Sequence, residues 1–193
     1  MKKFQWKKVF AFAMVLTMGL SFAGCGGEEA EETVESAETE TAVDEIQLVS
    51  TDFGTLTMDL PEDFGEVAVQ EGMTTAAAAG SSVIVSDPYE TDFAITDITE
   101  EAMLALVEGS YADAEIVVFQ NPTTAAGRDA VCTILEGTSA STGKANTVCY
   151  VMMFFTQDGV PYQQDVAFTF NTDAGTSLEA ALEEVVDSIS VAE

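Results

Sequence analysis

NTVCYVMMFFTQDGVPYQQDVAFTFN, residues 146–171, contains the strongest structural signal in this chain. Two long runs rich in β-branched and aromatic residues flank Asp158-Gly159, a dipeptide that suits the tight turn of a β-hairpin. We therefore predict antiparallel strands over residues 146–157 and 162–171. A third long strand is predicted over residues 129–136, and a loop at residues 137–145 connects it to the hairpin.

Shorter elements surround this hairpin. The pattern predicts strands over residues 46–49, 54–60, 66–70, 83–86 and 114–120, a strand or loop over the alanine-rich residues 73–82, and a turn at Asn121-Pro122. Two helices are predicted: residues 98–108, with Asp97 as the N-cap, and residues 177–189, with Thr176 as the N-cap. The second helix carries an apolar stripe suited to packing on a sheet. The sequence thus predicts an α+β fold, an antiparallel β-sheet with helices packed on it.

The N-terminus has the pattern of a targeting segment. Lysines precede an uncharged apolar run at residues 9–20, which is too short for a typical transmembrane helix and fits a secretory signal. The following Ala23-Gly24-Cys25 resembles the lipobox of bacterial lipoproteins, with Phe22 where leucine is usual. We predict a signal peptide at residues 1–24 and lipidation of Cys25, which would hold the protein at the extracytoplasmic face of the cell membrane. The alternative is an ordinary signal peptide with an incidental cysteine.

A tether and one domain are predicted after the lipidated cysteine. Residues 25–45 are expected to be disordered, because their glutamate, threonine, alanine and serine offer too little apolar surface to offset the chain entropy. The composition turns globular at residue 46. Residues 46–193 have a normal length for one globular domain.

The chain is strongly acidic once the signal peptide is excluded. Arg128 and Lys144 are then the only basic residues against 34 acidic ones, which gives a net charge of −32. Such a surface repels nucleic acid and attracts cations or a basic partner, and it also favours solubility. The chain contains no histidine, which excludes Ser-His-Asp and Cys-His catalytic arrangements and histidine-ligated metal sites.

Two groups of charged residues are candidates for binding. Asp87, Glu90, Asp92 and Asp97 form the densest local cluster of carboxylates in the predicted domain, and oxygen ligands of this kind suit a hard cation such as Ca²⁺. Their spacing matches no EF-hand loop, so a solvated acidic surface is the alternative. Arg128 can either bind an anionic ligand or form a surface ion pair with a neighbouring carboxylate.

Cys132 and Cys149 are predicted to lie on neighbouring antiparallel strands. In such a hairpin the numbers of paired residues have a constant sum; a loop centred near 141.5 gives a sum near 283, whereas the two cysteines sum to 281. The even difference puts both side chains on one face, either directly opposed or displaced by two residues. A disulfide or two buried reduced thiols would fit that arrangement.

The order of elements resembles that of PsbP-like domains. Residues 56–64 resemble their opening, a strand that runs into Leu-Pro-Glu and an aromatic residue, which is Phe64 here where tryptophan is common. Residues 182–190 are similar to their closing helix. The resemblance covers residues 46–191 and implies an α/β/α sandwich. Characterised members act mainly as accessory or binding proteins, and the resemblance brings no shared catalytic residues and no cofactor.

Together these observations predict a lipid-anchored, extracytoplasmic protein of the bacterial envelope. It would contact the membrane through its lipid, bind a protein partner or assist an envelope complex, and catalyse no reaction. Nucleic acid is not expected as a partner. The alternative is a cation-binding module or a carboxylate-dependent enzyme of the cell surface.

Overall fold

The predicted hairpin forms the middle of an eight-stranded antiparallel sheet. It is seen in a computed structural model, of which we describe residues 46–172 and 174–192. β9 (Ala145–Gln157) and β10 (Val160–Asn171) are paired along the length of β10. Asp158 and Gly159 make the turn between them, and both have positive φ, 51° and 84°. Two such residues form the kind of turn that matches the right-handed twist of a hairpin.

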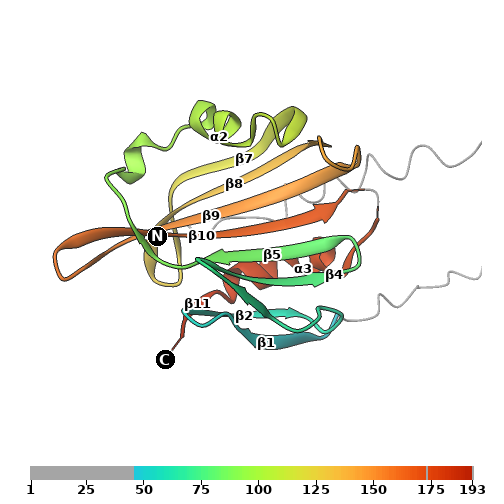
Figure 1. The fold of residues 1–193 in the computed structure, drawn as a ribbon, viewed down its shortest axis with the longest axis horizontal. Coiled ribbons are helices and arrows are strands. Elements are labelled where there is room, and N and C mark those ends of the chain that lie inside the picture. The colour runs from blue at the N-terminus through green and yellow to red at the C-terminus, as the bar shows by residue number, and fades with distance from the viewer. Residues whose placement is uncertain (1–45, 173, 193) are drawn as a thin grey trace, which may run out of the picture. The chain divides into compact units, whose positions relative to one another are not determined.

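The other strands extend this hairpin on both sides into the main sheet. They are β3 (Ala68–Gln70), β4 (Met73–Ala78), β5 (Ser81–Ser86), β6 (Tyr89–Glu90), β7 (Tyr111–Ala125) and β8 (Arg128–Ser139). The order across the sheet is β3, β4, β5, β10, β9, β8, β7, and β6 also pairs with β10. A separate three-stranded sheet, drawn below β4 and β5 in Figure 1, has the order β1 (Leu48–Asp52), β2 (Leu56–Pro61), β11 (Ser190–Val191).

Two helices flank the main sheet. α2 (Glu100–Val107) follows a 3₁₀ turn, η1 (Ile95–Asp97), and contacts β7. α3 (Ser177–Asp187) contacts β2 and lies behind the main sheet in Figure 1. Within the part of the chain that the structure describes, neither helix is long and apolar enough to span a bilayer. The predicted α+β fold, an antiparallel sheet with helices packed on it, is confirmed.

The side of the main sheet that faces α3 is a continuous apolar layer. Because side chains alternate along a strand, every second residue of the central strands points to this side. These residues are almost wholly buried: Val83, Val85, Cys149, Val151, Met153, Val166, Phe168 and Phe170. β2 and α3 add further buried side chains: Leu56, Met58, Leu60, Leu178, Leu182 and Val185. Removing so much apolar surface from water is the dominant favourable contribution to folding.

The intervening residues of the same strands form a second apolar layer under α2. Met103 of α2 packs with Val131 and Met152. One turn later Val107 packs with Leu135 and Val148. These contacts lie over β8 and β9, so α2 covers only part of the sheet.

The start of α2 differs from the prediction. Its N-cap is Thr99, whose Oγ1 accepts a hydrogen bond from the Ala102 N–H at 3.2 Å. The predicted cap, Asp97, instead accepts a hydrogen bond from the Ala94 N–H at 2.9 Å and so closes η1. Both residues can cap a helix, and the 3₁₀ turn inserted before α2 decides which one does.

The edge strand β7 also differs from the prediction. The chain does not turn at Asn121-Pro122, because β7 continues through this dipeptide with a cis peptide bond. Its pairing with β8 shifts register at three places: between Ala112 and Glu115, between Ile116 and Val118, and between Gln120 and Thr123. The Asn121 side chain donates hydrogen bonds to the carbonyl oxygens of Ile95 and Ile98, both at 2.7 Å. These bonds tie the irregular edge to the segment that leads into α2.

Candidate functional site

The α2 side of the main sheet has an uncovered part over β4, β5 and β10. Figure 1 shows α2 near β7 and far from β4 and β5. Register and alternation place seven side chains on this uncovered part, which is named the open face below: Met73, Thr75, Ala77, Ser82, Ile84, Ala167 and Thr169. All seven are half-buried or exposed.

A hydrogen-bonded group marks one end of the open face. Tyr89 Oη donates to Asp165 Oδ2 at 2.6 Å, and Gln163 Nε2 donates to Asp165 Oδ1 at 2.8 Å. The Asp165 N–H donates to Ser86 Oγ at 2.9 Å. Burial raises the pKa of Tyr89 well above its ordinary value, and the hydrogen bond to Asp165 and the charge of that carboxylate raise it further. The phenol therefore stays protonated, and its partly exposed ring is held in one orientation.

Large apolar side chains are exposed at the same end. Met73 and Ile84, on the adjacent strands β4 and β5, are 38% and 39% exposed, and Tyr89 of β6 is 42% exposed. A single exposed apolar residue is ordinary, but several neighbouring ones on a surface this acidic are typical of an interaction site.

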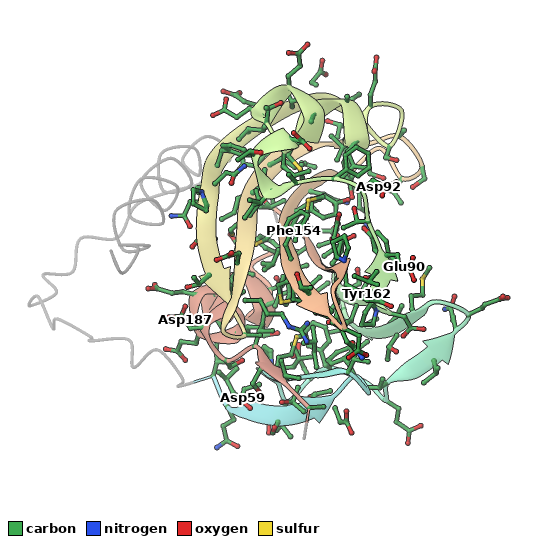
Figure 2. The ribbon with its side chains drawn as sticks, turned by 90° about the vertical axis from the view of Figure 1, so that its left-hand side faces the viewer. Asp59, Glu90, Asp92, Phe154, Tyr162 and Asp187 are labelled. Carbon is green, nitrogen blue, oxygen red and sulfur yellow. The ribbon has the colours of Figure 1, made fainter. Side chains whose placement is uncertain are left out.

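The four carboxylates proposed as cation ligands do not converge on one point. Glu90 lies in β6 opposite Tyr162, and Asp97 is engaged at the start of η1. Asp87 and Asp92 are exposed on either side of β6. Figure 2 shows Glu90 and Asp92 on the flank of the domain away from Asp187 of α3. Among the described residues, no three acidic or cysteine side chains are grouped so that they could hold a metal ion.

A hollow lies beyond the C-terminal end of α2. It is lined by small or hydroxyl-bearing residues: Gly109, Ser110, Tyr111, Ser139, Ala140 and Ser141. No charged side chain lines it, and none of the residues predicted from the sequence to bind a ligand belongs to it.

Cys132 and Cys149 lie on one face of neighbouring strands, as the predicted register requires. Cys132 pairs with Val151 and Ile134 pairs with Cys149, so the numbers of paired residues sum to 283. The two cysteines are therefore diagonal neighbours. Both thiols are free and buried, and their Sγ atoms are 4.0 Å apart. A hydrogen bond with Cys132 and complete burial raise the pKa of the Cys149 thiol well above its ordinary value.

We expect both thiols to be unreactive in the folded protein. A disulfide needs the sulfur atoms about 2.05 Å apart, and diagonal neighbours only marginally permit that approach. An alkylating reagent at pH 8 should therefore label Cys132 and Cys149 only after denaturant is added, because both sulfur atoms are buried. Mass spectrometry of the intact and the digested protein checks this expectation. A mass that rises by two hydrogen atoms on reduction would show instead that the disulfide forms.

Arg128 lies on the opposite side of the main sheet from the open face. Its guanidinium stacks on Phe155 and donates to the side chain of Gln164. Within the described residues it makes no ion pair, so the surface ion pair that the sequence allowed is not formed there.

Three side chains of these polar groups were not recognised from the sequence: Tyr89, Asp165 and Gln164. One of them left a signal. Gln164 occupies an inward position of β10 in line with Val166, Phe168 and Phe170. A polar residue at the start of such an apolar series indicates a buried hydrogen-bonding role.

The predicted lipidation site, Cys25, lies outside the described residues, as do the predicted signal peptide and tether. Their prediction rests on the sequence alone.

The fold is shared with solved structures of distant sequence. LpqN of Mycobacterium tuberculosis, described as involved in cell envelope biogenesis, matches with a TM-score of 0.53 at 14% identity, over 77% of this chain and 92% of its own. The Saccharomyces cerevisiae Ran-binding protein Mog1p matches with a TM-score of 0.51 at 11% identity, over 76% of this chain and 96% of its own. At such identities the likeness concerns the fold alone, which is of the Mog1 and PsbP-like type.

Sequence comparison adds no further relationship. No protein-family profile matches the chain, and no curated protein sequence matches it significantly.

Proposed function

We propose that this chain is a lipid-anchored, extracytoplasmic protein of the bacterial envelope. It binds a protein partner through the open face and through the charged residues at the rim of that face. The observation that carries the proposal is the exposure of Met73, Ile84 and Tyr89 at one end of an uncovered sheet. Binding surfaces commonly have an apolar centre and a polar rim, and this end has both.

The location in the envelope is supported by the lipobox-like Ala23-Gly24-Cys25 after a basic and apolar N-terminus. The neighbours of the same fold are in keeping with a binding role. LpqN is described as involved in cell envelope biogenesis, and Mog1p is described as a Ran-binding protein.

The charge of the rim defines the chemistry of the partner. Asp87 is exposed directly after Ser86, and Asp165 accepts hydrogen bonds from Tyr89 and Gln163 at the apolar end, so a matching surface would carry apolar side chains flanked by lysine or arginine. Opposite charges at a rim mainly accelerate association, and salt screens them. We therefore propose that complex formation slows as salt rises, while the apolar centre sets the lifetime of the complex.

Site-specific photo-crosslinking in living cells tests this proposal. A photoreactive amino acid at position 84, in the open face, is expected to yield a discrete adduct with one envelope protein. The matched control is position 117 in β7, because Val117 is also an exposed apolar strand residue, 47% exposed compared with 39% for Ile84. The control should yield no such adduct, since it lies at the opposite edge of the main sheet.

A second substitution separates specific binding from proximity. With the photoreactive group moved to position 73, the change Ile84→Glu should abolish the adduct, because it places a charge in the apolar centre. Equal adducts at positions 84 and 117, or an adduct that survives Ile84→Glu, would show that the open face is not the binding surface.

A further inference from the structure

A second candidate binding site surrounds Arg128, the single arginine of the chain. Arg128 begins β8 directly after the turn at Ala126 and Gly127. Alternation puts its side chain on the α3 side of the main sheet, the same side as Phe155 and Gln164. The site is therefore separate from the open face.

An aromatic surface supports one face of the guanidinium. The Cζ atom of Arg128 lies 3.8 Å from the centroid of the Phe155 ring. Phe155 in turn stacks on Tyr162, with the ring centroids 5.8 Å apart and the planes 18° apart. Stacking of this kind is favourable for a delocalised cation and restricts the plane of the guanidinium.

A buried amide fixes the orientation of the guanidinium within that plane. Arg128 Nη1 donates to Gln164 Oε1 at 2.8 Å. Gln164 is wholly buried, and its Nε2 donates to Thr55 Oγ1 at 2.6 Å and to the Ser86 carbonyl oxygen at 3.0 Å. Both amide N–H groups are thus used, so the amide oxygen must face Arg128.

The charge of Arg128 is not neutralised by the described residues. The chain has 34 acidic residues, yet the contacts of the guanidinium in the described part are an amide oxygen and a ring. Burial lowers the pKa of Arg128 below its ordinary value, although an arginine remains charged in proteins. Gln164 uses one of five guanidinium N–H donors, and a guanidinium edge presents two parallel donors that match an oxyanion. A rigidly held, partly desolvated cation without a counter-ion is arranged for binding an anion.

We propose that Arg128 binds a carboxylate group supplied by a ligand or partner, with Phe155 and Gln164 holding the guanidinium in place. A carboxylate is favoured over a phosphate group because it carries a single negative charge. The repulsion from a chain with a net charge of −32 after Cys25 is therefore smaller for the carboxylate. Its planar pair of oxygens also matches the guanidinium edge.

The single arginine makes the test direct. The full chain in detergent micelles, labelled with ¹⁵N-arginine, gives one Nε–H resonance, because Arg128 is the only arginine in the sequence. Sodium acetate is titrated against sodium chloride at constant ionic strength, and sodium phosphate is titrated in a parallel series. We expect a saturable shift of this resonance with acetate and a weaker response with phosphate.

Two variants complete the experiment. Lys144→Gln removes the other cation of the described chain and should leave the acetate response of Arg128 unchanged. Arg128→Lys keeps the charge but loses the planar pair of donors, so the acetate affinity followed at the backbone amides of Phe155 and Gln164 should fall at least about tenfold. A resonance that does not move, or moves without saturation, as acetate replaces chloride would overturn the proposal and confine Arg128 to packing on Phe155. A stronger response to phosphate than to acetate would overturn the choice of a carboxylate.

Discussion

Replacing Cys25 by serine is expected to abolish lipidation of the protein completely and to leave the precursor uncut, with residues 1–24 still attached. The reason is chemical, because the lipid is carried on the sulfur of the cysteine and a serine hydroxyl is a much weaker nucleophile. Metabolic labelling with a fatty acid and the migration of the protein on a gel measure the two effects. Each buried CH₂ of the proposed acyl chains would contribute about 0.8 kcal/mol to membrane partitioning.

A suitable control is Cys132→Ala, because Cys132 is buried in the domain and its removal should leave the fatty-acid label in place. If the wild-type protein takes up no label, the cysteine at position 25 is incidental and the anchored state is excluded.

Replacing Phe168 by alanine is expected to lower the free energy of unfolding by about 3–5 kcal/mol, the usual cost of removing a buried phenylalanine ring. Phe168 lies in the central strand β10, between Cys149 of β9 and Val83 of β5, and is wholly buried. The cavity would open in the middle of the core, where the neighbouring strands cannot collapse into it. Urea unfolding measures the loss as a lower midpoint at an unchanged slope.

The adjacent residue provides the control. Thr169→Ala changes the open face, where the side chain is half-buried, and should shift the free energy of unfolding by less than about 1 kcal/mol. Similar effects of the two substitutions would contradict the assignment of Phe168 to the core side of β10 and of Thr169 to the open face.

Local sequence was sufficient to predict the centre of this fold. The tight turn of this hairpin requires positive φ at both of its residues, and Asp158 and Gly159 can adopt it. Once this turn pairs Gln157 with Val160, the register of the remaining pairs along both strands is determined. The relation between Cys132 and Cys149 depended on the centre of the preceding loop: a centre near 141.5 corresponds to the observed sum of 283, whereas a shift of half a residue would have put the two side chains on opposite faces. Thr176 caps α3 as predicted, because a hydroxyl at that position meets the Glu179 N–H at 3.2 Å.

Long-range contacts decide what the sequence did not reveal. Asn121-Pro122 has the local character of a turn, yet β7 continues because β8 pairs with it on both sides of the dipeptide. The alanine-rich residues 73–78 form a strand because β5 lies beside them, an outcome that intrinsic preferences do not encode.

The candidate sites were predictable only in part. The carboxylates near β6 were recognisable from the sequence because they are close together in it. Their distances in space depend on the pairing of β6 with β10, and among the described residues they do not form a group that could hold a metal ion. Arg128 was recognisable from the sequence as the single arginine. The residues that hold its guanidinium, Phe155, Gln164 and Thr55, come from segments far apart in the sequence. No local pattern connects these segments, so the geometry of the site could come only from the folded chain.

The irregular edge strand has a consequence for how copies of this chain meet each other. A strand at the edge of a sheet can recruit a strand from a second molecule when it offers an evenly spaced row of backbone groups. β7 offers no long row of this kind, because its longest stretches in regular register with β8, Val118–Gln120 and Thr123–Ala125, have three residues each. Asp113 and Glu115 add exposed negative charge to the same strand. Edge-to-edge growth into dimers or fibrils through β7 is therefore disfavoured.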